Sequence, residues 1–290
     1  MKKISLKEYL SQQLSPHTVE AYSKEIEDYL SHYPKAVRAT HQEVMDYLSY
    51  LRTQYSKAST MNRRLSSIKA YYRYLTYSGK RKDDPARSIQ FKDKRSKDIQ
   101  LQDLFTTKEL EELLNKRFFK ASLHNRNKVL LSLLVYQGLQ ARELEALQTI
   151  DIDLKEATVY IRKSRTSNER TLALKSNQIL LLNTYLKEDR PRLLKEKPSP
   201  FLLLDQDGKQ GIAESYTSYV KRTFKNLFKE RKVTITTIRQ SVITNLLKAG
   251  HDLRVVQVFA GHRYPSTTEK YKQSHIEALQ TAIERYHPLQ

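Results

Sequence analysis

Apolar residues recur at helical spacing along most of this chain, and this pattern constrains its fold more than any other feature. One stripe advances by alternating steps of three and four residues and comprises Ala58, Met61, Leu65, Ile68, Tyr72 and Leu75. Such a stripe lies on one face of an α-helix that other elements must cover. Ser15 followed by Pro16 predicts an earlier helix start, and Thr40 with Glu43 predicts a capping box for another. The first hundred residues therefore predict a helical domain.

A stretch with few large apolar residues, 81–104, predicts a linker after this domain. A capping box formed by Thr106 and Glu109 opens the next region, which is again mostly helical. Within it, 158–161 and 171–174 are β-branched and apolar segments that predict a pair of strands. We therefore predict a mainly α protein with two domains. The first is helical (1–80), and the second (105–290) contains one small antiparallel sheet and ends in a tail helix.

The charge of the chain favours a polyanionic partner. Lys and Arg number 52 against 32 Asp and Glu, which gives a formal net charge of +20. A charge excess of this size concentrates nucleic acid near the protein. No apolar run approaches the roughly 18 residues of a membrane span, and the first residues lack the apolar core of a signal peptide, so we expect a cytoplasmic protein without a membrane partner. The chain has no Cys and no paired-histidine motif, so we expect neither a metal nor another cofactor.

Basic residues and tyrosines are concentrated in 47–82. This stretch contains nine basic residues, seven tyrosines and no acidic residue. A basic run is usually only a solvated face. Here the one-sided charge, with Ser, Thr, Asn and Tyr as further donors, favours contacts with DNA phosphates. The candidate DNA-binding residues are Arg52, Arg63, Arg64, Lys69 and Arg73.

Three residues near the C-terminus carry the chemistry needed to cut a phosphodiester without a metal. Arg239 precedes His262 by 23 residues, and Tyr271 follows His262 by nine. A phenol can attack phosphorus and hold the strand as a phosphotyrosine, and a guanidinium can grip the non-bridging oxygens. Because a tyrosine pKa is about 10, the attack needs a base or a strongly polarised phosphate.

The order and spacing of these residues resemble the active site of tyrosine-type site-specific recombinases, the phage integrase family, and are closest in layout to the XerC/XerD type. Segments 14–22 and 59–75 are similar to the SAM-like core-binding domain of that family. The resemblance therefore covers nearly the whole chain. It implies that Tyr271 is the nucleophile, that Arg239 is the second catalytic arginine and that His262 binds phosphate.

The family also has a lysine on a β-hairpin that can protonate the leaving 5′ oxygen. Counting back from Glu169 and Arg170 places Arg165 at this position, and Lys163 lies two residues earlier on the same strand face. Because the pKa of an arginine exceeds 12, it is a poor proton donor. This difference in acidity slightly favours Lys163 as the proton donor. The alternative is that this residue is only a solvated charge on the hairpin.

This chain departs from the family pattern at two positions. The first catalytic arginine of the family pattern G-x-R-x-x-E-L is Gln140 here, with Gly138 and Glu143 fixing the register. The histidine of the pattern H-x-x-R is Thr236 here. Loss of one transition-state donor typically costs about 100- to 1000-fold in rate. Either another residue, such as Arg142 or Arg126, compensates, or cleavage is slow, or the protein mainly binds DNA.

The resemblance implies a site-specific recombinase or integrase of a mobile element that cuts and rejoins double-stranded DNA through a 3′-phosphotyrosine. It also implies a homotetramer on two sites, with the tail after Ile276 docked on a neighbouring copy. The alternative is a catalytically impaired or accessory DNA-binding relative. A third reading is relaxation of supercoils by the same chemistry, as in type IB topoisomerases, against which the two-domain layout argues.

Overall fold

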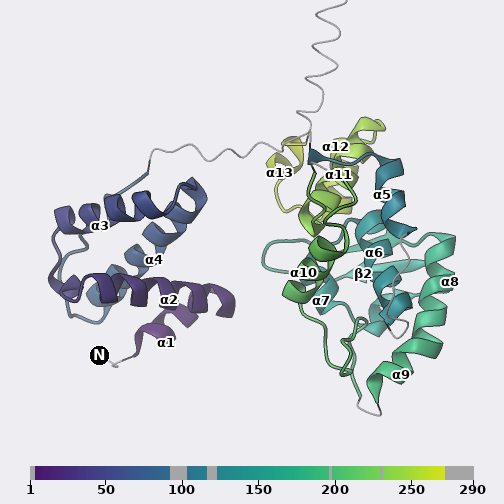
Figure 1. The fold of residues 1–290 in the computed structure, drawn as a ribbon, viewed down its shortest axis with the longest axis horizontal. Coiled ribbons are helices and arrows are strands. Elements are labelled where there is room, and N and C mark those ends of the chain that lie inside the picture. The colour runs from purple at the N-terminus through teal and green to yellow at the C-terminus, as the bar shows by residue number, and fades with distance from the viewer. Residues whose placement is uncertain (1–3, 92–102, 116–122, 196–197, 229–230, 272–290) are drawn as a thin grey trace, which may run out of the picture. The chain divides into compact units, whose positions relative to one another are not determined.

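A computed structural model of the chain describes residues 4–91, 103–115, 123–195, 198–228 and 231–271 (Figure 1). The described residues form two compact units, one within 1–97 and the other within 98–290. Each unit has a hydrophobic core of its own. The tail helix expected after Ile276 lies outside the described residues.

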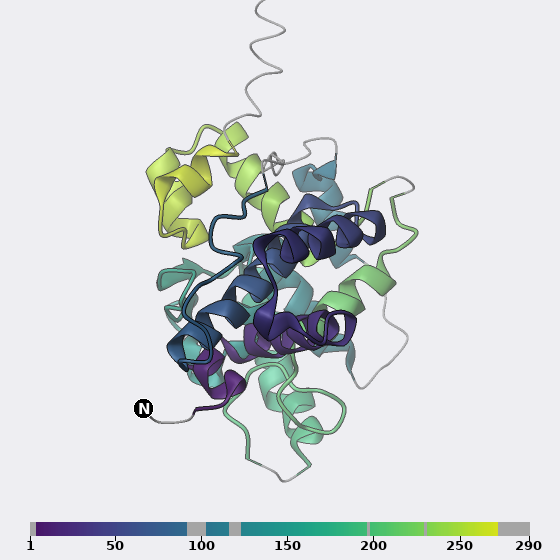
Figure 2. The same cartoon turned by 90° about the vertical axis from the view of Figure 1, so that its left-hand side faces the viewer.

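The first unit consists of helices whose starts follow from local capping. The Ser15 hydroxyl accepts the Thr18 amide at the start of the second helix, and Thr40 and Glu43 form the expected capping box. These predictions are confirmed. The helical elements of the unit are α1 (Leu6–Ser11), α2 (Pro16–His32), a 3₁₀ turn (Ala36–Arg38), α3 (His41–Gln54) and α4 (Ala58–Tyr77) (Figures 1 and 2).

The apolar stripe of α4 forms the centre of the first core. From Met61 to Leu75 its members are at most 5% exposed, as helical spacing predicts. The Tyr72 hydroxyl donates to the Ala36 carbonyl at 2.9 Å and lies 2.6 Å from the Tyr29 hydroxyl. Four of the seven tyrosines in 47–82 are buried, so these four are core residues rather than phosphate donors. They are Tyr47, Tyr71, Tyr72 and Tyr74.

The first unit continues beyond Gly79, which has a φ of 70° and follows the last turn of α4. Ala86 and Ile89, which lie in the stretch expected to be a linker, are buried in the first core. Arg81 forms a two-pronged contact with Asp83, with both N···O distances at 2.8 Å. Residues 81–91 are therefore part of the packed structure of the first unit.

The second unit combines helices with one small sheet, and the mainly α fold class is confirmed. Three antiparallel strands are ordered β1-β2-β3, and Val159 of β2 pairs with Leu172 of β3. The two longer strands were predicted, whereas β1 has only two residues and was missed. The elements of this unit are α5 (Thr107–Leu114), α6 (His124–Gln137), α7 (Ala141–Ala146), β1 (Ile152–Asp153), β2 (Thr158–Ile161), β3 (Arg170–Ala173), α8 (Ser176–Thr184), a π-helical turn (Tyr185–Asp189), α9 (Arg190–Leu194), α10 (Ala213–Thr223), α11 (Ile235–Lys248), α12 (Leu253–Ala260) and α13 (Pro265–Glu269).

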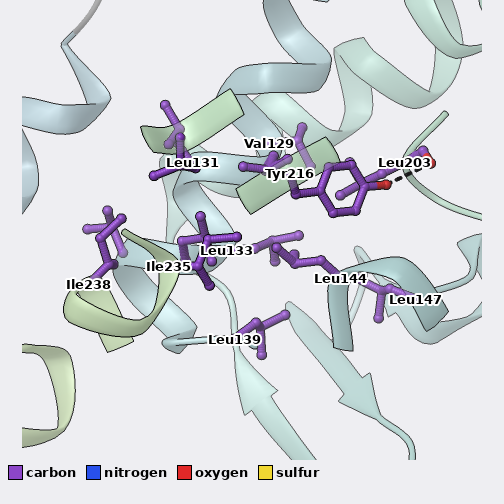
Figure 3. Close-up of a cluster of buried hydrophobic side chains, with 14 of the residues drawn as sticks. Val129, Leu131, Leu133, Leu139, Leu144, Leu147, Leu203, Tyr216, Ile235 and Ile238 are labelled. Carbon is purple, nitrogen blue, oxygen red and sulfur yellow. Dashed lines mark hydrogen bonds between the residues drawn. The ribbon is translucent and has the colours of Figure 1, made fainter. Parts of the chain in front are cut away.

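Helix α6 runs through the middle of the second core. Every residue from 129 to 135 on this helix is buried, which requires neighbours on all sides. Figure 3 shows Val129, Leu131 and Leu133 among side chains from several other elements, with the Tyr216 hydroxyl 3.2 Å from the Leu203 carbonyl. The helix ends at Gly138, whose φ of 60° favours glycine. This end of α6 lies next to the candidate site.

Among the described residues, no helix is both long enough and apolar enough to cross a membrane.

Candidate active site

The segment from α11 to Tyr271 contains the three residues singled out in the sequence. Arg239 lies on α11, His262 follows the end of α12, and Tyr271 follows α13. Figures 1 and 2 show α11, α12 and α13 grouped at one end of the second unit. Arg239, His262 and Tyr271 are 7%, 9% and 8% exposed, respectively. The rings of His262 and Tyr271 stack with centroids 5.9 Å apart and planes 18° apart.

Arg239 is held by backbone carbonyls from two helix ends. Its Nη1 donates to the Gly138 carbonyl at 2.7 Å, and its Nη2 donates to the Ala260 carbonyl at 2.5 Å. Its Nη1 also lies 3.8 Å from the Glu143 carboxylate. Each Nη carries a second hydrogen, and Nε carries one more. The guanidinium is thus fixed in direction before any ligand is present.

Glu143 accepts several hydrogen bonds beneath this site. Arg170 donates from Nη1 and Nη2 to the two carboxylate oxygens at 2.8 and 3.0 Å. The Ser167 hydroxyl and the Gln140 amide donate to the same carboxylate at 3.0 and 2.9 Å. Burial alone would raise the pKa of Glu143, but the hydrogen bonds and charge of Arg170, together with Arg239, hold it below its ordinary value. Glu143 is therefore a carboxylate at neutral pH.

The imidazole of His262 is neutral at pH 7. Burial lowers its pKa to about 4, and the positive charges of Arg239 and Arg170 act in the same direction. Its Nδ1 lies 2.9 Å from the Thr268 hydroxyl oxygen. A neutral imidazole has an N–H at one ring nitrogen and a lone pair at the other. The contact at Nδ1 therefore decides whether Nε2 carries the proton or the lone pair.

The phenol of Tyr271 is also neutral at pH 7. Burial raises its pKa above the ordinary value, and the charge of Arg239 offsets part of this effect. The Tyr271 amide donates to the Thr268 carbonyl at 3.0 Å. Loss of the phenol proton during the attack on phosphorus therefore depends on charged groups that the substrate brings to the site or exposes there.

The β2–β3 hairpin lies against the Gly261–His262 backbone. The Asn168 amide donates to the Gly261 carbonyl at 2.9 Å, and Ser167 forms a β-bridge with His262. Gly261 has a φ of 68°, and a Cβ there would lie 2.6 Å from Arg170 Nη1 and 2.7 Å from Ser167 Oγ. Only glycine fits this position without displacing the hairpin.

Lys163 and Arg165 both lie in the loop of this hairpin, with exposed side chains. The Arg165 carbonyl accepts a 2.7 Å hydrogen bond from Nη1 of Arg263, the residue after His262. The backbone of the loop is thus attached to the candidate site. Its two cationic side chains extend from that backbone.

The two atypical positions lie on the first turns of helices. Gln140 is half-buried and is the N-cap of α7, whereas Thr236 is exposed in the first turn of α11. Arg142 is exposed on α7. Arg126 is engaged in the core, where its Nε donates to the Leu204 carbonyl at 2.8 Å and its guanidinium lies over the Tyr216 ring. Compensation by Arg126 is therefore not supported.

Two of the candidate DNA-binding arginines pair with acidic residues of α2. Arg63 Nη2 lies 2.8 Å from the carboxylate of Glu25, and Arg64 Nη1 lies 3.3 Å from that of Asp28. Arg64 Nη2 also donates to the Tyr55 hydroxyl at 2.8 Å. The sequence of α4 alone did not reveal these acidic neighbours, because they lie more than 30 residues earlier.

The other three candidates have different surroundings. Lys69 Nζ donates to the Arg87 carbonyl at 3.1 Å, and Arg73 Nε donates within its own helix to the Lys69 carbonyl at 3.3 Å. The guanidinium of Arg52 lies 4.9 Å from the centroid of the Phe91 ring. Arg52 and Arg73 are exposed.

Sequence reasoning used Glu143 and Arg170 only to fix the register, and it did not single out Ser167 or Thr268. The Glu143–Arg170 pair joins residues 27 positions apart, so it becomes visible only in the folded chain. The sequence offered one local signal, which was positional. Glu143 is an acid at the third position of α7 and Arg170 is an arginine at the start of β3, and both positions face inward.

Comparisons with known proteins agree with this arrangement. Residues 103–277 match the phage integrase family, and residues 5–79 match the phage integrase N-terminal SAM-like domain. Tyrosine recombinase XerD of Listeria monocytogenes is 26% identical over 283 residues, which cover 95% of this chain and 94% of the relative. Tyrosine recombinase XerC of Pelotomaculum thermopropionicum is 29% identical over 288 residues, which cover 94% of this chain and 93% of the relative.

Solved structures show the same fold. The XerH site-specific recombinase bound to its difH substrate matches with a TM-score of 0.73 and 19% identity, over 96% of this chain and 84% of that chain. A lambda integrase dimer bound to a COC′ core site matches with a TM-score of 0.68 and 14% identity, over 92% of each chain. Because the match to the catalytic part alone covers more than half of the sequence, this chain belongs to the phage integrase family.

Proposed function

We propose that this protein is a site-specific recombinase that cuts and rejoins double-stranded DNA through a phosphotyrosine formed at Tyr271. The observation that carries the proposal is the clustering of a guanidinium, an imidazole and a phenol. Arg239, His262 and Tyr271 are each less than a tenth exposed, and the last two stack at 5.9 Å. The resemblance to the XerC and XerD relatives supports the same reading.

In the proposed reaction the Tyr271 hydroxyl loses its proton as its oxygen attacks phosphorus, the bond from phosphorus to the 5′ oxygen breaks, and the 5′ oxygen takes up a proton. The products are a 3′-phosphotyrosyl strand and a 5′-hydroxyl strand, and the reverse step joins a new 5′-hydroxyl without ATP. Arg239 and His262 donate hydrogen bonds to the non-bridging oxygens, whose charge rises in the transition state. The additional negative charge that develops on the phosphate in the transition state also favours the protonated forms of nearby basic groups.

The leaving 5′ oxygen needs a proton, for which Lys163 is the better candidate and Arg165 the second. A lysine ammonium can give up a proton near neutral pH more readily than a guanidinium. Gln140 lies where the family has its first catalytic arginine and offers the phosphate a neutral amide. Thr236 replaces a histidine and offers a hydroxyl. Both replacements predict slower cleavage than in a complete site.

DNA binding is proposed to use both parts of the chain. The helical domain (1–80, with 81–91 packed in the same unit) contributes Arg52, Arg63, Arg64, Lys69 and Arg73, and 105–290 carries the chemistry. Four copies on two DNA sites would exchange strands in the cytoplasm, as the resemblance implies. Light scattering of the protein with a two-site DNA should then give the mass of four chains, and a mass of one chain per site would contradict the tetramer.

The decisive experiment uses a nicked suicide substrate, from which the short 5′-hydroxyl strand diffuses away and traps the covalent adduct. We expect the wild-type protein to form an adduct on a denaturing gel, and Tyr271→Phe to form none while it binds DNA with nearly unchanged affinity. Tyr264→Phe is the matched control, because Tyr264 is the N-cap of α13, the helix that precedes Tyr271, and is 68% exposed. An adduct that persists in Tyr271→Phe, or that is lost in Tyr264→Phe, would contradict the assignment.

The second candidate function is that of an accessory DNA-binding relative without efficient cleavage. The observation that favours it is the presence of Gln140 and Thr236 at two catalytic positions. In that case the wild-type protein would bind the suicide substrate and give no adduct, even after long incubation. The same gel therefore separates the two functions.

A further inference from the structure

Thr268 links the imidazole and the nucleophile of the candidate site. Its side chain is completely buried, and its hydroxyl oxygen lies 2.9 Å from His262 Nδ1. Its carbonyl accepts the Tyr271 amide at 3.0 Å. One residue of α13 thus contacts both groups, the first through its side chain and the second through its backbone.

We propose that Thr268 is a positioning residue that donates its hydroxyl hydrogen to Nδ1 of His262, so that Nε2 carries the imidazole proton and presents an N–H to the DNA phosphate. The proposal rests on the function proposed above and adds the tautomer of His262 and its cause.

The direction of the hydrogen bond follows from the burial of the hydroxyl. A hydroxyl always has one hydrogen to donate, and a buried donor without an acceptor costs about 1–3 kcal/mol. The acceptor that the structure gives the Thr268 hydroxyl is Nδ1. With Nδ1 as the acceptor, the single proton of a neutral imidazole must be on Nε2.

The proton on Nε2 matters because the imidazole is not charged. Burial beside Arg239 and Arg170 lowers the pKa of His262 to about 4, so the ring has one N–H rather than two. The opposite tautomer would turn a lone pair toward the phosphate oxygens and weaken binding of the transition state. In a site where Gln140 replaces an arginine, the remaining N–H donors carry a larger share of this stabilisation.

The stacked geometry argues against a different use of Nε2, as a base toward Tyr271. A ring nitrogen directs its lone pair or its proton in the plane of the ring. The His262 and Tyr271 planes are only 18° apart, so Nε2 does not point at the face of the phenol ring. The geometry therefore fits a phosphate donor better than a base for the nucleophile.

The first test is ¹⁵N NMR of the full-length protein without DNA, with selectively labelled histidines. The ¹⁵N shifts of the two ring nitrogens report which one is protonated, and His262→Gln identifies the signals. We expect the wild type to carry the proton on Nε2 at pH 7. Thr268→Ser should keep this tautomer, whereas Thr268→Val, which has the same shape without the hydroxyl, should populate the Nδ1–H form. A wild type with its proton on Nδ1 would overturn the proposal.

The second test measures single-turnover cleavage of the suicide substrate. We expect Thr268→Val to slow cleavage by about 10- to 100-fold with unchanged DNA affinity, and Thr268→Ser to stay within a few-fold of wild type. If Thr268→Val changes the tautomer of His262 but cleaves as fast as the wild type, the claim that this tautomer speeds cleavage is contradicted. If Thr268→Val does not fold, Thr268→Ala takes its place. If no variant cleaves, the proposed function fails, and the NMR result still decides the role of Thr268.

Discussion

At the scale of single residues, burial sets the chemistry of this site before DNA is present. His262, Tyr271 and Arg239 all have pKa values shifted toward their neutral forms, and burial is the largest cause in each case. An arginine stays charged even so. The free protein therefore holds the Arg239 guanidinium close to two neutral groups, His262 and Tyr271, with the Glu143–Arg170 ion pair nearby.

His262 should make the folded state less stable as the pH falls. Its folded pKa is about 4 against an ordinary value of 6.5. Between these values the unfolded chain binds a proton that the folded chain does not, so stability is lost as the pH falls from about 6.5 toward 4. We expect His262→Gln to have a shallower fall in the free energy of unfolding over this range, measured by urea unfolding at several pH values. The remaining histidines are common to both proteins, and equal slopes would show that His262 is not a neutral buried group.

Replacement of Gln140 tests whether the site lacks a cation. An arginine there would offer a bidentate contact next to the Glu143 carboxylate, and we expect Gln140→Arg to speed single-turnover cleavage by about 10- to 100-fold. Gln140→Met, which has similar length and no charge, serves as the control and should not speed it. Thr236→His should give a smaller gain of its own. A wild type that is fast and is slowed by Gln140→Arg would show that another cation, such as Arg142, already fills this place.

At the scale of elements, the hairpin and the His262 loop are joined by few contacts. Arg263 donates to the Arg165 carbonyl at 2.7 Å, and the Asn168 amide donates to the Gly261 carbonyl at 2.9 Å. The first contact is exposed, so it should be worth about 1 kcal/mol or less. The position of Lys163 and Arg165 relative to His262 depends in part on this exposed bond.

Loss of the Arg263 contact should loosen the tip of the hairpin. We expect Arg263→Ala to raise the hydrogen exchange rate of the amides at 164–167 by up to about five-fold, because about 1 kcal/mol corresponds to that factor. The Asn168 amide should stay protected by Gly261. Arg254→Ala, which removes an exposed arginine of α12, is the control. Unchanged exchange at the hairpin tip would mean that the Asn168 and Ser167 contacts hold the loop alone.

Local chemistry made many elements predictable from the sequence. The capping boxes at Thr40 and Thr106 depend on residues within one turn of each other, and both were predicted correctly. Features that depend on distant contacts were not predictable. The two-residue strand β1 was missed, and the π-helical turn after α8 has no local signal.

The candidate site also contains some features that could be predicted from the sequence and others that depend on distant contacts. The family spacing identified Arg239, His262 and Tyr271, which remain proposed catalytic residues, and the structure brings them together. The Glu143–Arg170 pair and the Thr268 contact were missed, because each depends on how separate segments meet in the fold. The acidic partners of Arg63 and Arg64 were missed for the same reason.

At the scale of the whole molecule, positive charge is spread along the entire chain. Residues 1–104 contain 20 basic and 12 acidic residues, and the rest contains 32 and 20. If six or more phosphates are contacted, DNA affinity should fall by about 10³ or more between 50 and 200 mM salt. Fluorescence anisotropy with a labelled duplex measures this fall, and an affinity that does not change with salt would contradict electrostatic binding.

The ion pairs on α4 refine this prediction for individual residues. Arg73 is exposed and hydrogen bonded only within its own helix in the contacts described, so Arg73→Ala should reduce the salt slope by about one phosphate contact. Arg64 is already paired with Asp28, so Arg64→Ala should change the slope less. The opposite order would show that DNA displaces Asp28 and takes over Arg64.

The two separate hydrophobic cores have a consequence for engineering. Side chains from Leu10 to Ile89 pack in one core, and those from Phe105 to Val242 pack in the other. A chimera joined within 92–102 would leave both cores with their own side chains, whereas a junction at residue 80 would separate Ala86 and Ile89 from the core that contains them. In an exchange of the first unit for that of a relative, the crossover point therefore decides whether both cores stay intact.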